Sequence, residues 1–173
     1  LTPVGITRWK GEEWITQRAL DTANFTVEKD ALTLCGNGLD LCDRKMQGLL
    51  LVRQQERAFT AETALEIPAA GTAGLTCYYD EHSYLKFGIG PEGLLLEEYA
   101  GYEVVSRQTA PLPASTSHVR LRVTAADGQR HFAIQDRTDW HTLWSIPEPR
   151  YLTSEGLQCG KRFTGAMVGL YVH

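Results

Sequence analysis

Hydrophobic and polar side chains alternate along residues 57–67. One parity carries Phe59, Ala61, Thr63, Leu65 and Ile67, and the other carries threonine, glutamate and alanine. A period of two is typical of a strand with one buried face and one solvated face. Residues 75–79 and 85–89 continue the alternation after short connections. Because short turns join antiparallel strands whereas parallel strands need long crossovers, the three runs predict an antiparallel sheet.

Further short strands are expected along the rest of the chain. They cover residues 30–35, 49–55, 94–99, 102–106, 118–124, 131–135 and 163–173, and residues 139–144 follow the turn after the strand at 131–135. Asp127-Gly128 is a two-residue hairpin signal, and only residues 39–48 and 152–158 leave room for a helical turn. Many short strands without a long helix predict an all-β fold, an antiparallel β-sandwich. We expect one sandwich domain over residues 14–173, preceded by a lead-in or linker over residues 1–13.

Composition and charge exclude several classes of function. The 173 residues are 43% hydrophobic and 22% charged, with a formal net charge of −4, which is ordinary for a soluble globular protein. No cluster of basic residues is present to attract a phosphate backbone, so a nucleic-acid role is not expected. The apolar runs 49–52 and 94–96 are far shorter than the roughly 18 residues that span a bilayer, so no membrane segment is expected.

The cysteines and histidines do not have the spacing of a metal site. The four cysteines form no C-x-x-C pair and the five histidines are scattered, so no metal and no cofactor is expected. Cys77 lies on the apolar side of its strand and is interpreted as a small buried side chain. Cys35 and Cys42 flank a turn, and whether they form a disulfide stays open.

Catalytic groups are not evident in the sequence. A glycosidase needs two carboxyl groups roughly 5 to 10 Å apart in different environments. The carboxylates here fall on solvated strand faces or in turns, and the adjacent Glu97 and Glu98 point to opposite faces of a strand. The strained serine turn G-x-S-x-G is also absent. We therefore expect no catalytic residue in this chain.

Sugar binding is the more physical alternative, because sugars stack on flat aromatic side chains. The candidates for stacking are Tyr78, Tyr84, Trp140 and Trp144. The competing interpretation is that these are ordinary half-buried aromatic residues of a sheet.

Short motifs run through most of the chain in a fixed order. They are W-I-T-Q-R at 14–18, A-L-T-L-C-G at 31–36, L-L-V-R-Q-Q at 50–55, F-T-A-E-T at 59–63, A-G-L-T-C-Y-Y at 73–79, D-W followed by Leu143 at 139–143, and F-T-G-A followed by V-G-L at 163–170. In this order they resemble the C-terminal domain of glycoside hydrolase family 43 β-xylosidases, a concanavalin A-like jelly roll. Gln17 stands where that family usually has leucine.

The resemblance implies a parent enzyme with an N-terminal β-propeller that holds the catalytic carboxylates. The present chain is then an accessory domain that stabilises and shapes the active site of that propeller, its partner in cis, for short xylosides or arabinofuranosides. By itself it is expected to be non-catalytic. In the family, a loop before F-T-G-A sends an aromatic side chain to the mouth of the pocket. The matching positions are Arg162 and Phe163, so Arg162 departs from the family pattern.

Two other readings stay open. One is a carbohydrate-binding or lectin-like module with a sugar site of its own, and the other is a structural sandwich that forms homo-oligomer contacts. The unpaired-looking cysteines, and the usual action of the family on imported oligosaccharides, favour a cytoplasmic location. The preference between xyloside and arabinofuranoside and the binding of calcium stay open.

Overall fold

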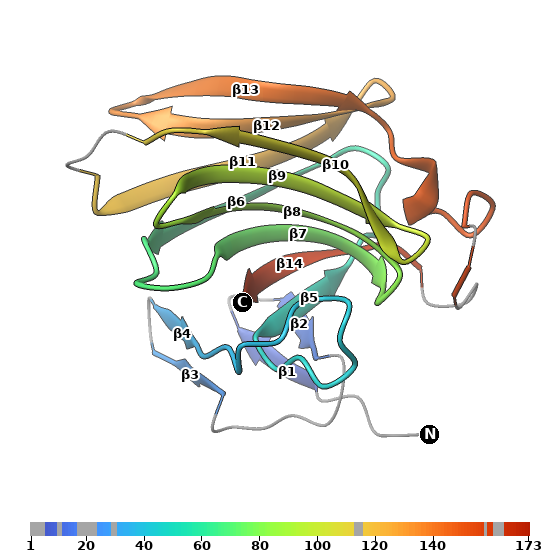
Figure 1. The fold of residues 1–173 in the computed structure, drawn as a ribbon, viewed down its shortest axis with the longest axis horizontal. Coiled ribbons are helices and arrows are strands. Elements are labelled where there is room, and N and C mark those ends of the chain that lie inside the picture. The colour runs from blue at the N-terminus through green and yellow to red at the C-terminus, as the bar shows by residue number, and fades with distance from the viewer. Residues whose placement is uncertain are drawn as a thin grey trace.

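The described residues form two main antiparallel sheets (Figure 1). This computed structural model describes residues 6–9, 12–16, 24–28, 31–112, 116–157, 159–160 and 165–173. Within them, the larger sheet has the strand order β1-β2-β5-β14-β7-β8-β9-β10. Its strands are β1 Ile6–Trp9, β2 Glu12–Ile15, β5 Leu49–Arg53, β7 Ala73–Asp80, β8 Ser83–Gly90, β9 Gly93–Ala100, β10 Glu103–Ala110 and β14 Met167–Val172.

The smaller sheet has the strand order β13-β12-β11-β6. Its strands are β6 Phe59–Glu66, β11 His118–Ala126, β12 Gln129–Asp136 and β13 Asp139–Pro147. A separate hairpin pairs β3 Phe25–Val27 with β4 Leu32–Leu34, and a 3-10 turn, η1, covers Arg150–Leu152. The predicted all-β antiparallel sandwich is confirmed.

The main hydrophobic core lies between the two sheets. It joins alternate residues of β7, β8 and β9 to alternate residues of β11 and β12: Leu75, Cys77, Tyr79, Leu85, Phe87, Ile89, Leu94, Leu96, Val119, Leu121, Val123 and Phe132. Phe87 packs edge-on against Phe132 and Trp144, with ring centroids 5.4 and 6.1 Å apart. The alternation in the sequence therefore identifies the inward side of these strands correctly.

One expectation about the sheets is wrong. β6 does not share a sheet with β7 and β8; it pairs with β11 in the smaller sheet. The chain crosses between the sheets after Pro68, whose ring lacks an N–H for a ladder. Gly71 in this crossing has φ +70, and a Cβ there would lie 1.7 Å from the carbonyl oxygen of His173. Alternation identifies a buried face, but it cannot tell which of two facing sheets the strand belongs to.

The turns agree largely with the sequence. Asp127 and Gly128 have φ of 52° and 71°, as a two-residue hairpin of the predicted kind requires. Residues 39–48 form turns without a helix, and within the described residues 152–157 helical structure is limited to the end of η1. Among the described residues, no helix is long and apolar enough to cross a membrane.

The cysteines give a prediction about reactivity. Cys35 and Cys42 are exposed and free, whereas Cys77 is buried in the main core, where burial raises the pKa of its thiol. Because the thiolate is the reactive form, a thiol reagent should label Cys35 and Cys42 promptly and Cys77 only after unfolding. The measurement is a colorimetric thiol titration in a Cys159→Ser background, before and after denaturant. Prompt labelling of three thiols in the folded variant would contradict the placement of Cys77.

Candidate functional site

The face of the larger sheet that points away from the main core is covered by the segment between β4 and β5. This covering loop (residues 35–48) places Leu41 and Met46 against Tyr78 and Tyr84 in a second hydrophobic cluster. The amide of Asn37 closes the loop, because it donates to the Lys45 carbonyl at 2.9 Å and accepts from the Gln47 N–H at 3.3 Å. The loop explains why β7 and β8 are buried on both faces.

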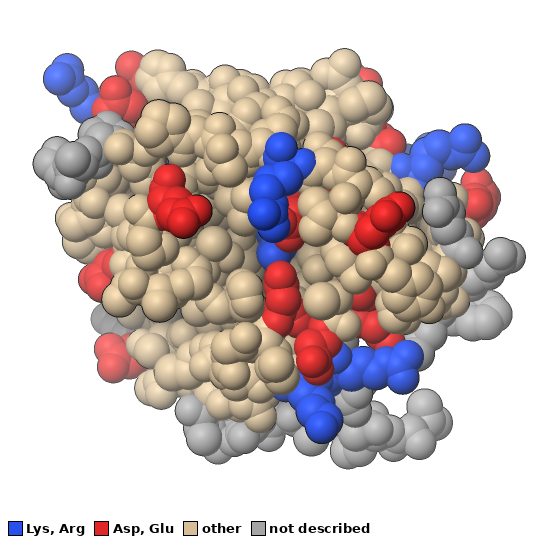
Figure 2. Space-filling model, in the orientation of Figure 1, with Lys and Arg blue, Asp and Glu red and all other residues tan. Residues whose placement is uncertain are grey.

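A row of charged side chains crosses this face beside the covering loop. Lys86, Glu97 and Arg107 are register partners on β8, β9 and β10, so they lie side by side. Figure 2 shows basic and acidic side chains gathered in a line near the centre of a largely uncharged face.

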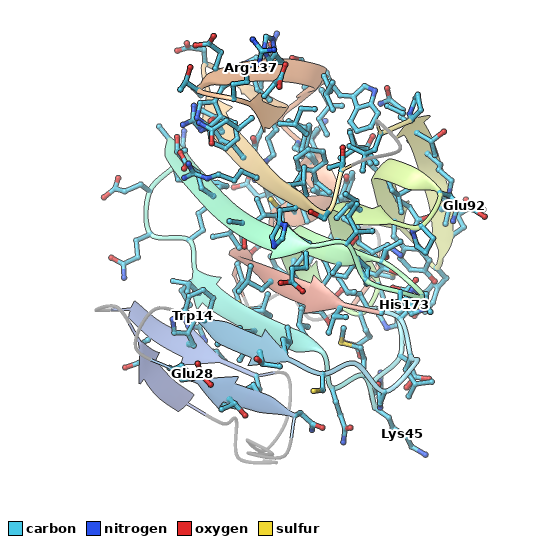
Figure 3. The ribbon with its side chains drawn as sticks, turned by 90° about the vertical axis from the view of Figure 1, so that its left-hand side faces the viewer. Trp14, Glu28, Lys45, Glu92, Arg137 and His173 are labelled. Carbon is cyan, nitrogen blue, oxygen red and sulfur yellow. The ribbon has the colours of Figure 1, made fainter. Side chains whose placement is uncertain are left out.

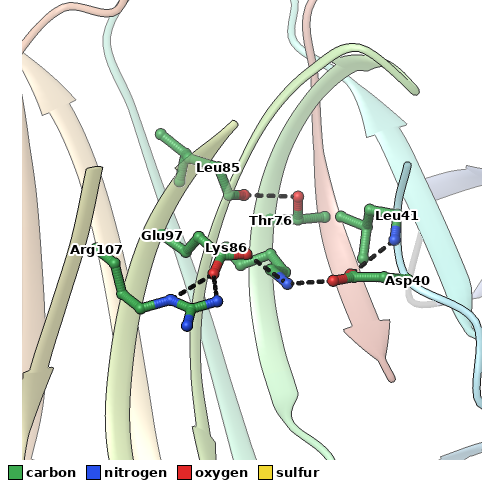
Figure 4. Close-up of polar contacts among 7 residues, drawn as sticks. All are labelled: Asp40, Leu41, Thr76, Leu85, Lys86, Glu97 and Arg107. Atoms are coloured by element: carbon green, nitrogen blue, oxygen red, sulfur yellow. Dashed lines mark hydrogen bonds and ion pairs between the residues drawn. The ribbon is translucent and has the colours of Figure 1, made fainter. Parts of the chain in front are cut away.

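Lys86 is the centre of this charge row (Figure 4). Its Nζ donates to Glu97 Oε1 at 2.7 Å and to Asp40 Oδ2 of the covering loop at 2.7 Å. Arg107 Nε donates to Glu97 Oε2 at 2.7 Å, and its Nη2 contacts the same oxygen. The side chains of Lys86 and Glu97 are 3% and 2% exposed, so two ions are held almost entirely away from water.

The chemistry of the charge row does not match an acid–base pair. Burial raises the pKa of Asp40, but the charge and hydrogen bond of Lys86 and the Leu41 N–H together hold it below its usual value. A glycosidase general acid needs a raised pKa instead. No group of His, Cys, Asp and Glu side chains within the described ranges is arranged to hold a metal ion. Asp40 is therefore not suited to act as that acid, whereas the ion pairs of the row suit binding or structure.

The lowered pKa of Asp40 gives a prediction about acid stability. Since the folded-state pKa lies below the value of 3.8 in the unfolded chain, the Asp40–Lys86 pair stabilises the fold above that pH. The contribution is lost as the pH falls through the folded-state pKa. The free energy of unfolding, measured with urea at neutral pH and again in this acid range, should fall on acidification by about 1 kcal/mol more in the wild type than in Asp40→Asn. Equal losses in both proteins would contradict the prediction.

The family of the chain follows from comparison with known proteins. The family model described as the beta xylosidase C-terminal concanavalin A-like domain matches residues 10–173. The chain belongs to this family. The resemblance found in the sequence motifs and the concanavalin A-like fold are both confirmed.

Individual relatives are much longer than the present domain. The beta-xylosidase of Bacillus subtilis (strain 168) is 27% identical over 163 residues, which are 84% of this chain and 31% of the relative. The structure titled Bacteroides ovatus Xyloglucan PUL GH43B has a TM-score of 0.79 at 22% identity, covering 95% of this chain and 33% of its own. The xylan beta-1,4-xylosidase of Bacillus halodurans has a TM-score of 0.77 at 21% identity, covering 92% and 33%. This concanavalin A-like domain thus spans about a third of the length of these relatives.

Tyr78 and Tyr84, two of the four residues predicted to stack on a sugar, lie under the covering loop of this concanavalin A-like domain. Tyr78 and Tyr84 are 3% and 1% exposed, and Tyr84 stacks on Tyr99 with ring centroids 4.7 Å apart. Burial also raises the pKa of the Tyr84 hydroxyl far above its ordinary value, so it stays neutral. Neither buried ring presents a face to a ligand in this structure.

The other predicted positions have different surroundings. Trp140 lies on the outer face of the smaller sheet, where the guanidinium Cζ of Arg122 is 3.8 Å from its ring centroid. Trp144 is half-buried with its ring edge-on to Phe87. Stacking of a sugar on Trp140 or Trp144 stays a prediction. Arg162 and Phe163 lie outside the described residues.

Sequence reasoning missed the charge row. Lys86 and Glu97 fall on the polar side of their strands, and polar-side charges were expected to be solvated. Glu97 and Glu98 do point to opposite faces as expected, since Glu98 accepts from the Tyr151 hydroxyl at 2.8 Å beside the main core. The sequence does show one signal, because Lys86 is a single charged residue between Leu85 and Phe87 in an otherwise uncharged strand. Its partners could not be identified from the sequence, because they come from distant segments.

Proposed function

We propose that this chain is the accessory C-terminal domain of a family 43 glycoside hydrolase that acts on xylan-derived oligosaccharides. The observation that carries the proposal is the match of residues 10–173 to a β-xylosidase C-terminal domain, combined with relatives about three times as long. The length of the relatives is consistent with an N-terminal catalytic domain joined in cis.

In this role the domain stabilises the catalytic propeller and shapes the mouth of its active site. Arg162 and Phe163 are the positions proposed to reach the substrate, with Arg162 replacing the aromatic side chain usual in the family. The substrate class is β-xylosides or α-arabinofuranosides of short length. We place the protein in the cytoplasm, a reducing compartment that suits the free Cys35 and Cys42.

The test uses the complete reading frame that encodes this chain, and a version that lacks residues 14–173. Hydrolysis of aryl β-xyloside and aryl α-arabinofuranoside is measured, together with the melting temperature of each protein. The intact protein is expected to hydrolyse at least one substrate, and the deletion is expected to lower both kcat/KM and the melting temperature. Full activity and unchanged stability of the deletion would overturn the accessory role.

A further inference from the structure

The charge row borders a cavity of about 410 Å³ on the outer face of the larger sheet. Lys86, Glu97 and Arg107 of the row and Asp40, the loop partner of Lys86, all contribute to its wall. The volume lies in the lower part of the range of small-molecule sites, roughly 300 to 1,000 Å³. Figure 3 shows that Glu92 and His173, which also line the cavity, lie on the same side of the molecule.

The cavity lies next to the charge row, towards the β8–β9 turn. The neighbouring cross-strand row consists of Gly88, Leu95 and Thr109, and the last pair before the turn is Gly90 with Gly93. A Cβ at Gly88 would lie 2.1 Å from the Tyr171 hydroxyl oxygen, so the Tyr171 side chain fills the space above Gly88. The cavity opens beyond it, where Gly90 and Gly93 line it together with Leu95 and Thr109 as apolar and hydroxyl-bearing walls.

The charged groups hold each other in place and keep unused bonding capacity. Lys86 has three N–H donors, of which Asp40 and Glu97 take two. Arg107 has five N–H donors and directs Nε and Nη2 to Glu97, while its side chain is 60% exposed. The side chain of Asp40 is 27% exposed, and its two oxygens accept from Lys86 Nζ and from the Leu41 N–H. A ligand in the cavity thus meets the remaining N–H groups of Arg107 and the exposed part of Asp40, both of which are held in place by their partners in the row.

The balance of charge selects the class of ligand. The two carboxylates of the row are matched by one lysine and one arginine, and Glu92 adds a further negative charge at the exposed turn, with His173 counted as neutral. This balance disfavours an anion. A neutral ligand whose groups both donate and accept satisfies such a wall, and the hydroxyl groups of a sugar do so. Leu95 and Pro91 provide apolar contact for the C–H surface of a sugar ring.

We propose that this cavity binds a pyranose unit of a neutral oligosaccharide, namely xylose in β-1,4-linked xylo-oligosaccharides. The choice of xylose rests on the proposed function, whereas the site rests on the cavity and the charge row. The domain then holds substrate chains near the enzyme without acting on them.

The test is titration calorimetry of the 173-residue chain with xylobiose, xylotetraose and cellobiose. Saturable binding of the xylo-oligosaccharides with a millimolar or tighter Kd is expected. Arg107→Met should weaken it about tenfold, because a charge-assisted hydrogen bond is lost while Lys86 still pairs with Glu97. Thr109→Val, which removes one hydroxyl at nearly constant shape, should weaken it about threefold. Arg137→Met is the matched control, since Arg137 is exposed and lies away from Glu92 and His173 in Figure 3.

Three outcomes would overturn the proposal. They are no saturable binding of any xylo-oligosaccharide, equal binding by wild type and Arg107→Met, and tighter binding of cellobiose than of xylobiose. The proposed function is tested separately by hydrolysis of aryl xyloside by the wild-type protein made from the complete reading frame. Hydrolysis without any binding in the titration overturns the sugar site alone, whereas no hydrolysis overturns the proposed function, so the two failures are distinguishable.

Discussion

Gly169→Ala is expected to destabilise the sandwich by about 3 kcal/mol or more, because overpacking against backbone has little means of relaxation. Gly169 lies in β14, between β5 and β7 near the middle of the larger sheet. A Cβ at this position would lie 1.9 Å from the Leu50 carbonyl oxygen and 2.8 Å from the Leu51 Cα. The clash can be relieved only if β14 and β5 move apart within the larger sheet. Urea unfolding followed by circular dichroism measures the loss.

The matched control is Gly38→Ala in the covering loop. Gly38 has φ +78 and no atom within 4 Å of a built Cβ, so the substitution carries backbone strain without a clash. Its cost should be about 1 kcal/mol. A loss of the same size at Gly38 and Gly169, or a wild-type unfolding midpoint for Gly169→Ala, would show that β14 is packed differently.

Lys86→Met is expected to cost about 3 kcal/mol, because it leaves the buried carboxylate of Glu97 with only the partly exposed Arg107. The double variant Lys86→Met/Glu97→Leu removes both buried ions and places apolar side chains beside the second hydrophobic cluster. Since well-packed apolar replacements of a buried ion pair are often neutral, the double variant should recover most of the loss. The measurement is the free energy of unfolding of the wild type, both single variants and the double variant.

That series of variants also bears on the binding proposal. If Lys86→Met is within about 1 kcal/mol of the wild type, the two ions are better solvated than the structure indicates. If the double variant is less stable than either single variant, the row is needed for packing. Recovery of stability together with loss of sugar binding would instead separate the two roles of the row.

Local patterns predicted most of the strands from β4 onward, but they missed β1, β2 and β3 and predicted the assembly of the strands less well. The alternation at 59–67 identified the inward side of β6 but could not assign it to a sheet, because both sheets face the same core. The hairpin at Asp127-Gly128 was predictable, since its backbone demands residues that tolerate positive φ. The motifs of the chain, taken in order, predicted the family although each motif alone is weak.

The candidate site depended on contacts between distant segments. Lys86 meets Asp40 from 46 positions earlier in the chain, and Arg44 of the covering loop reaches Glu81 at 2.7 Å. These contacts bring the loop over Tyr78 and Tyr84 and thereby bury rings that were proposed to meet a ligand. Such a contact needs the register of the sheet and the path of the loop, and neither is contained in a local pattern.

Whether the catalytic groups lie outside these 173 residues is tested by hydrolysis of an aryl β-xyloside, measured side by side for the 173-residue chain and for the complete reading frame that encodes it. We expect the isolated chain to fold, shown by a cooperative unfolding transition, and to have no activity, and we expect the complete protein to hydrolyse the substrate. Hydrolysis by the folded isolated chain, or no hydrolysis of aryl xyloside or arabinofuranoside by the complete protein, would show that the chain is not an accessory domain of such an enzyme.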